Sequence, residues 1–238
     1  MTDSTALDGF LDKWRKRWPE WAVVEVFVPA SQRRLAVAWF ALQQEFVDAM
    51  NIAGDPLPGD AKLAWWGEEL RDWSRQRSRH PLGRVLEPQR APWGVLADAL
   101  PVVALMREQP VNAETAFTTS RALASAIIEV ESALFGHPPD EAQVQAVGAQ
   151  LLAARLEEAG TAAVPATAPD CQSGPLESAW TTELLQRWPE RIDGAVPCRL
   201  WSALARSRLQ RFRAAGEGIA PLSPARALWL GWRAARRR

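Results

Sequence analysis

The sequence predicts an all-α protein built as one helical bundle. Apolar residues recur at three- and four-residue steps in segment after segment, which is the period of an amphipathic helix. One stretch rich in β-branched residues, 22–28, has no partner strand, so we expect an extended segment leading to Pro29. With 47% apolar residues, the 238-residue chain can fill one sizeable core, and we expect a single domain over 1–238.

The first part of the chain contains three predicted helices. The apolar stripe of the first helix consists of Leu7, Phe10, Leu11, Trp14 and Trp18. We expect Ser31 to cap the second helix and Asp60 to cap the third, with a Gly- and Pro-rich loop over 54–59 between them. His80 stops the third helix, because the residue before a proline is pushed out of helical geometry.

The third helix has one apolar and one charged side. Its apolar stripe, at three- and four-residue steps, consists of Leu63, Trp66, Leu70 and Trp73. The charged residues that we expect to face mainly outward are Glu68, Glu69, Arg71 and Asp72. We expect His80 to order the following turn by hydrogen bonding.

The remaining helices are separated by prolines, glycines and caps. We expect them at 93–108, at 112–136, from 139 onward, and at 176–188, 197–215 and 223–238. Pro101 should break the first of these, and Asn112 should cap the second. The segment 160–174 has prolines and few large apolar residues, which predicts a long flexible surface loop.

Composition argues against several classes of function. The 28 basic and 28 acidic residues balance, which gives no argument for nucleic-acid binding. No apolar run reaches membrane-spanning length, and the first residues lack the features of a secretory signal. Cys171 and Cys198 are far apart and form no disulfide framework, so we expect a cytoplasmic protein. Two histidines and scattered cysteines do not support a zinc site.

Two stretches of the chain resemble a known family. Residues 61–86, AKLAWWGEELRDWSRQRSRHPLGRVL, combine a Trp-Trp helix with a His-Pro turn. Upstream, FVPASQRR at 27–34 precedes AWFALQQEFVD at 38–48. Together they resemble the opening of the squalene/phytoene synthase family, over 23–86, and the rest of the chain follows the family's helix order. The resemblance implies an isoprenoid (terpenoid) synthase-type bundle whose helices line a central cavity, and head-to-head joining of prenyl diphosphates held through Mg²⁺.

The family's two Asp-x-x-x-Asp motifs are both incomplete here. At the first, Gln44 and Asp48 keep the i, i+4 spacing, and Glu45 with Asp48 form a candidate pair of metal ligands. At the second, Gln150 matches the family's glutamine, and Glu157 or the adjacent Glu158 replaces the first aspartate. Because Mg²⁺ requires several oxygen ligands, the resemblance implies a reduced metal site of Glu45, Asp48 and Glu157.

The same resemblance supplies candidate substrate contacts. Arg33, Arg34 and Arg155 are candidates for binding phosphate through their planar guanidinium groups. Gln44 and Gln150 complete the candidate substrate-binding set. No residue is assigned a catalytic role, and Mg²⁺ is expected as a cofactor only if the protein is an enzyme.

The last predicted helix is basic and rich in tryptophan. Residues 191–238 carry 11 basic and 2 acidic residues. In the helix, one apolar stripe consists of Ala225, Leu228, Trp229 and Trp232, and the opposite face carries Arg226, Arg233 and Arg237. We expect the apolar stripe to pack on the bundle, as the family's last helix does. The alternative is a helix lying on an anionic membrane surface or a protein partner.

Three functions are compatible with these features. The first is a catalytically degenerate relative that binds an isoprenoid or another lipid in a helical cavity without condensing it. The second is an active, Mg²⁺-dependent prenyltransferase of isoprenoid biosynthesis. The third is a non-catalytic assembly or scaffold protein, resembling the family branch implicated in assembling respiratory complex I, and located in the cytoplasm or at the inner face of a membrane.

Overall fold

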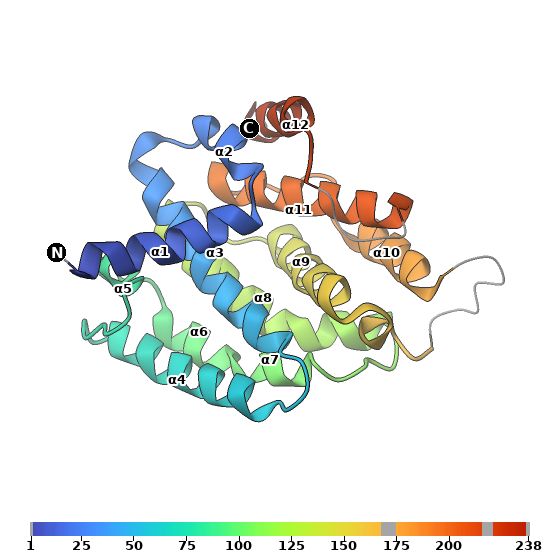
Figure 1. The fold of residues 1–238 in the computed structure, drawn as a ribbon, viewed down its shortest axis with the longest axis horizontal. Helices are drawn as coiled ribbons and strands as arrows, with labels where there is room; N and C mark the ends of the chain where they lie inside the picture. The colour runs from blue at the N-terminus through green and yellow to red at the C-terminus, as the bar shows by residue number, and fades with distance from the viewer. Residues whose placement is uncertain (1, 168–174, 216–220, 237–238) are drawn as a thin grey trace.

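The long helices begin and end where the sequence places caps and breakers. The computed structural model describes residues 2–167, 175–215 and 221–236 (Figure 1), and this part of the chain contains helices and 3₁₀ turns but no strand. Asn112 caps α8 by accepting a hydrogen bond from the backbone N–H of Thr115, and Gly136 ends that helix at a φ of 72°. The α6/α7 break falls at Pro101, as predicted.

The elements of the described residues are as follows. The helices are α1 (Thr2–Arg17), α2 (Trp21–Val24), α3 (Ala30–Met50), α4 (Leu57–Trp73), α5 (Gly83–Leu86), α6 (Trp93–Ala99), α7 (Pro101–Leu105), α8 (Ala113–Phe135), α9 (Glu141–Ala159), α10 (Leu176–Arg187), α11 (Val196–Ala215) and α12 (Pro224–Arg236). The 3₁₀ turns are η1 (Glu25–Phe27), η2 (Glu87–Gln89) and η3 (Gly160–Ala163). None of the described helices is both long and apolar enough to span a bilayer.

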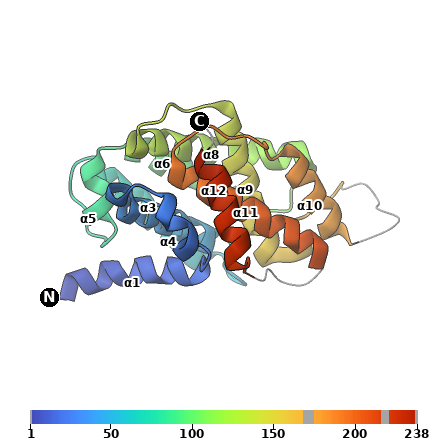
Figure 2. The same ribbon diagram turned by 90° about the horizontal axis from the view of Figure 1, so that it is seen from above.

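Helix α3 runs through the centre of the bundle. It contacts α1, α4, α5, α7, α9 and α11, and every residue from 36 to 46 is buried. Figure 1 shows α1 crossing over α3, with α4 on the opposite side from α11, while Figure 2 shows α12 lying across the outside of α11. A helix that is buried all round positions its polar residues between other helices, and α3 carries the first candidate motif.

Aromatic rings fill the space between α1, α3 and α11. Phe40 on α3 lies 4.3 Å from the ring of Trp201 on α11, measured between ring centroids, and 5.4 Å from Trp14 on α1. Trp18 and Trp21 complete this cluster, and all five residues are buried. Aromatic side chains bury large areas and prefer such edge and tilted contacts, so this cluster is a main source of packing energy.

Three local predictions at the N-terminal side are wrong. Residues 21–27 form α2 and η1 rather than an extended segment, because Trp21 and Val24 are buried together on one side of a helical turn. α3 begins directly after Pro29, so Ser31 is not its cap, and α4 begins at Leu57. Asp60 therefore lies within the first turn of α4, where it pairs with Arg107.

Glu69, one of the four charged residues of α4 expected to face mainly outward, is fully buried. Its carboxylate accepts hydrogen bonds from the Trp73 indole at 2.8 Å, from the backbone N–H groups of Arg79 at 2.7 Å and His80 at 2.8 Å, and from Arg79 Nε at 3.0 Å. His80 Nδ1 in turn accepts from the backbone N–H of Leu82, which confirms its role in ordering the turn. The family-like Trp-Trp and His-Pro segment is thus held together by one buried acid.

The predicted loop at 160–174 begins with ordered structure. Residues 160–163 form η3, and both Ala163 and Val164 are buried. The backbone N–H groups of Ala166 and Thr167 each donate 2.9 Å hydrogen bonds to carbonyl groups of the α7–α8 connection. These contacts fix the first half of the segment, while residues 168–174 lie outside the described residues.

Candidate functional site

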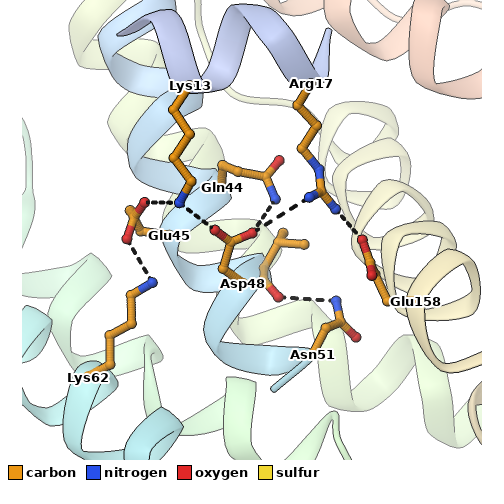
Figure 3. A network of polar contacts seen from close by, with 9 residues as sticks. Lys13, Arg17, Gln44, Glu45, Asp48, Asn51, Lys62 and Glu158 are labelled. Atoms are coloured by element: carbon orange, nitrogen blue, oxygen red, sulfur yellow. Dashed lines mark hydrogen bonds and ion pairs between the residues drawn. The ribbon is translucent and has the colours of Figure 1, made fainter. Parts of the chain in front are cut away.

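The acidic residues of the two motif regions meet beneath α1. Figure 3 shows Glu45 and Asp48 on α3, and Glu158 on α9, with the side chains of Lys13 and Arg17 reaching them from α1. The two regions therefore face each other, as the family resemblance implies. What lies between them is a set of basic side chains from the same chain.

Lysine ammonium groups neutralise the first motif region. Lys13 Nζ lies 3.2 Å from Glu45 Oε1 and 2.9 Å from Asp48 Oδ2, so it bridges the two carboxylates. Lys62 on α4 binds the second oxygen of Glu45, with an Nζ–Oε2 distance of 2.7 Å. Glu45 is thus held between lysines from two different helices.

Arg17 connects the first region to the second. One of its nitrogens, Nη1, lies 4.0 Å from Asp48 Oδ1, and its Nη2 pairs with Glu158 on α9. Gln44 donates a 2.8 Å hydrogen bond to the same Oδ1 of Asp48. The i, i+4 spacing of Gln44 and Asp48 therefore produces a contact between the two side chains rather than a pair of metal ligands.

The charges in this network stabilise one another. Burial opposes ionisation of Asp48, but hydrogen bonds from Lys13 and Gln44 outweigh it and lower the pKa of that carboxyl. Burial also opposes the charge of Lys13, and the hydrogen bond to Asp48 with the attraction of Glu45 raises its pKa overall. Both groups are therefore charged at neutral pH. Glu45, Asp48 and Glu158 face Lys13, Arg17 and Lys62, so acids and bases balance.

This donor set does not fit Mg²⁺. A magnesium ion needs carboxylate oxygens at about 2.1 Å in octahedral geometry. Both carboxylates on α3 already accept from lysine ammonium groups, and Glu158 on the facing helix pairs with Arg17. Among the residues that the structure describes, no group of three or more His, Cys, Asp or Glu side chains is arranged to hold a metal ion.

Glu157, the third candidate metal ligand, has a different environment. Much of this residue is exposed, but neighbouring protein atoms partly desolvate its carboxyl group. Burial of that group, opposed by the positive charges of Arg208 and Arg17, raises its pKa to about 7. It is Glu158 rather than Glu157 that forms the ion pair with Arg17.

The candidate substrate-binding residues lie in separate places. Arg33 donates to the backbone carbonyl groups of Val28 and Val26, at 3.1 and 3.4 Å, and Arg34 pairs with Asp8 at 3.3 Å. The remaining arginine, Arg155, donates to Asn51 Oδ1 at 3.0 Å and to the Arg107 carbonyl at 2.9 Å. Each guanidinium group thus holds parts of the protein together.

A small cavity lies between α3, α8, α9 and α11. Gln150 lines it together with Gln43, Glu131, Cys198 and Trp201, and its volume is about 40 Å³. A buried water needs roughly 10–15 Å³ of such volume, whereas ligand pockets usually have about 300–1,000 Å³. The cavity in this conformation has room for a few waters but not for a prenyl chain.

The cavity wall contains an acid, Glu131, whose ionisation is opposed by burial. Trp39 Nε1 donates to Glu131 Oε1 at 3.0 Å, and Gln43 Nε2 donates to the same atom at 3.4 Å. Burial raises the pKa of the Glu131 carboxyl, although these hydrogen bonds oppose the shift. Burial and the neighbouring Glu131 also raise the pKa of the Cys198 thiol. The Glu131 carboxyl group and the Cys198 thiol therefore form a polar packing contact between α8 and α11.

Three residues of the network were missed in the sequence. Lys13 and Arg17 have the i, i+4 spacing that places two side chains on one helix face, and this signal was available. Lys62 precedes Leu63, the first residue of the apolar stripe of α4, and no spacing in the sequence pairs it with Glu45. Their importance depends on α1 crossing α3, which is a tertiary contact that local spacing does not reveal.

The arrangement of the helices shows the fold type of this protein. Its all-α, single-domain architecture is that of the isoprenoid (terpenoid) synthases, as the sequence predicts. The structure is similar to the crystal structure of squalene synthase HpnC from Alicyclobacillus acidocaldarius, with a TM-score of 0.54 and 17% sequence identity, over 96% of this chain and 91% of that chain. At this identity the similarity shows the fold alone.

Sequence comparisons add no closer assignment. No protein-family model matches the chain, and no curated protein matches it at a significant level.

Proposed function

We propose that this protein is a catalytically degenerate relative of the squalene synthases that acts as a non-catalytic assembly or scaffold protein. The observation that carries the proposal is the bridge that Lys13 forms between Glu45 and Asp48. The Lys13 ammonium group lies at the place where an enzyme of this fold would require carboxylates free to bind metal ions.

The proposal follows from what the condensation of prenyl diphosphates requires. Loss of a diphosphate leaving group is assisted by divalent cations that neutralise the developing negative charge. In this chain Glu45, Asp48 and Glu158 form ion pairs with Lys13, Arg17 and Lys62. These bases are in turn engaged by acids, so they do not form an open cluster of positive charge for a diphosphate.

The packing of the interior favours a surface function over a ligand carrier. The cavity lined by Gln150 has about 40 Å³, and the nearby space between α1, α3 and α11 is filled by the Trp14, Phe40 and Trp201 rings. A carrier that encloses a prenyl chain requires a volume several times larger. The first of the three functions therefore has less support than the scaffold function.

An assay of diphosphate release tests the absence of catalysis. The protein is incubated with farnesyl diphosphate or geranylgeranyl diphosphate, Mg²⁺ and a nicotinamide reductant, with an active squalene synthase as the positive control. We expect no diphosphate above the level of a protein-free sample. Mg²⁺-dependent release that disappears in an Asp48→Ala variant would show instead that the protein is an active prenyltransferase.

A further inference from the structure

The last helix packs on the bundle with its small residues. Ala227, Gly231 and Ala234 of α12 are buried against the protein. At Gly231 the approach is so close that a Cβ atom would lie 2.8 Å from Val24 Cγ1 and 2.9 Å from the Phe27 ring. The expected inward packing of the Leu228, Trp229 and Trp232 stripe is therefore wrong, because only the small-residue face fits against α2 and η1.

The large apolar residues of α12 face solvent instead. Leu228 is 48% exposed, Trp229 is 53% exposed and Trp232 is 47% exposed. Of the 13 tryptophans in the chain, Trp229 and Trp232 are the most exposed, and Trp65 is next at 36%. Three half-exposed large side chains on one helix form a patch of the kind that marks an interaction surface.

Arginines surround this apolar patch. The guanidinium group of Arg233 lies 5.4 Å from the ring centroid of Trp229, and that of Arg236 lies 4.7 Å from the ring centroid of Trp232. These contacts hold positive charge beside the exposed indoles. Arg237 and Arg238 follow in the sequence, outside the described residues.

A basic groove between α11 and α12 adjoins the patch. Its volume is about 300 Å³, and its lining includes four arginines and one carboxylate, namely Arg199, Arg206, Arg226, Arg233 and Glu190. Trp229 also lines it, so the groove and the apolar patch are continuous. Arg206 Nε is buried there and has no hydrogen-bond partner in the structure. The guanidinium groups that line the groove are hydrogen-bond donors suited to phosphate oxygens.

The chemistry of α12 favours one of two anionic partners, a phospholipid surface, over the other, an acidic protein surface. From Pro224 to Arg236 the helix contains only Pro, Ala, Arg, Leu, Trp and Gly. Its polar side chains, arginine and tryptophan, are hydrogen-bond donors that accept nothing. Phospholipid headgroups present phosphate and ester oxygens, which are acceptors, next to an apolar layer. A protein surface presents donors and acceptors together, so the donor-only face of α12 matches the lipid surface better.

We propose that the outer face of α12, with the adjoining arginine groove, docks the protein onto an anionic phospholipid bilayer. Leu228, Trp229 and Trp232 enter the boundary between headgroups and acyl chains, and the arginines bind lipid phosphates. The helix has 13 residues, or about 20 Å, so it lies along the surface. This inference goes beyond the scaffold function, because it depends on α12 and is independent of whether the acids on α3 bind a metal.

Vesicle co-sedimentation tests the proposal with the full chain. Vesicles of phosphatidylcholine alone are compared with vesicles of phosphatidylcholine and phosphatidylglycerol in equal amounts. We expect binding to the anionic vesicles that weakens with added salt, and little binding to the neutral ones. Equal binding to both kinds of vesicle, or to neither, would overturn the proposal.

Two variants locate the contact. Trp229→Ala with Trp232→Ala should weaken binding to anionic vesicles by about tenfold or more. Arg226→Glu with Arg233→Glu should weaken it by at least about thirtyfold, because each reversal replaces attraction by repulsion. The matched controls are Leu57→Ala with Leu105→Ala, two exposed leucines elsewhere, and Arg75→Glu with Arg77→Glu. Unchanged binding in the α12 variants, or an equal loss in the controls, would contradict the assignment.

Two further measurements separate docking on lipid from unfolding of the variants and from binding to an acidic protein. The thermal unfolding midpoint of each α12 variant should equal that of the parent, because the substituted side chains face outward. Soluble poly-glutamate serves as an acidic polypeptide without an apolar layer. If it binds as tightly as the vesicles and competes with them, the surface recognises an acidic protein and the bilayer proposal is wrong.

Discussion

Lys13 on α1 donates a 2.9 Å hydrogen bond to Asp48 on α3, at the first of the two motif regions. Together with Gln44, this contact lowers the pKa of Asp48 against the opposing effect of burial. The lysine also reaches Glu45, so a single ammonium group neutralises the two carboxylates that were the best candidates for metal ligands. An ion pair within the chain therefore lies where the family resemblance implies metal ligands.

Removing the lysines should create a cation site. We expect Lys13→Met combined with Lys62→Met to leave Glu45 and Asp48 without their lysine partners and to lower the unfolding midpoint at neutral pH. The three ion pairs that are lost are partly exposed, so the loss should be only about 1 kcal/mol. Added Mg²⁺ should raise the unfolding midpoint of this variant part of the way back to that of the parent, because a ligand bound only to the folded state stabilises it.

The control is Lys16→Met, which removes an exposed lysine from the same helix. It should change neither the midpoint nor its response to Mg²⁺. The interpretation is wrong if the parent protein already shows the same rise with Mg²⁺ as the double variant.

Glu69 should be important for stability although it is not one of the candidate metal ligands. We expect Glu69→Ala to lower the free energy of unfolding by about 3 kcal/mol or more, because it leaves the Trp73 indole and two backbone N–H groups without an acceptor. Glu68→Ala, at the exposed neighbouring position, should cost less than about 0.5 kcal/mol. Urea titrations of the two variants provide the measurement, and equal losses would show that the buried network is not needed.

Acid should weaken the contact between the N-terminal region and α11. Buried Glu20 pairs with Arg208 and accepts from the backbone N–H of Leu222 at 3.0 Å. Burial opposes its ionisation, but these partners lower its pKa below the ordinary value of 4.5. A lowered folded-state pKa gives stability that is complete above about pH 4.5 and is lost as the pH falls through the folded-state value.

A variant tests this pH dependence. Glu20→Gln should be about 3 kcal/mol less stable than the parent at neutral pH, since Arg208 is left buried without a charge partner. The difference between the two proteins should shrink as the pH is lowered to about 3, because Glu20 of the parent becomes protonated. Urea unfolding across this pH range is the measurement, and a difference that is independent of pH would refute the assignment.

Two glycine substitutions should have opposite effects. Gly231→Ala places a methyl group against Val24 and Phe27, and we expect it to cost about 1–3 kcal/mol. Gly9→Ala, in α1, meets no atom within 4 Å, and should stabilise the protein by about 0.5–1 kcal/mol because alanine favours the helix. Thermal unfolding distinguishes them, and a neutral Gly231→Ala variant would show that α12 is not closely packed there.

Much of the fold could be predicted from the sequence because local signals agree. The stripe of Leu63, Trp66, Leu70 and Trp73 is buried as expected, and Asn112 and Pro101 mark a cap and a break. The orientation of α12 could not be predicted in this way. Its large residues form the obvious apolar stripe, but the close approach of Val24 and Phe27 to Gly231 admits only the small face.

The candidate site was predictable only in part. The spacing of Glu45 and Asp48 places both on α3 near the facing acid of α9, which the structure shows. Whether these two carboxylates are free to bind a metal ion depends on Lys13, which is 32 residues distant from Glu45 in the sequence. No local pattern reports such a contact, since it arises from the packing of α1 on α3. The roles assigned to Arg33 and Arg34 followed the family, and here both side chains make contacts within the protein.

Thermal unfolding with farnesyl diphosphate, in the presence and absence of Mg²⁺, is the most direct measurement of the central claim that the protein's own cations have replaced the metal site. If Lys13, Arg17 and Lys62 hold the acids as observed, the midpoint should not rise with Mg²⁺ and the diphosphate together beyond what each produces alone. A cooperative, Mg²⁺-dependent rise would contradict the claim, because it would show that the acids still assemble a diphosphate site.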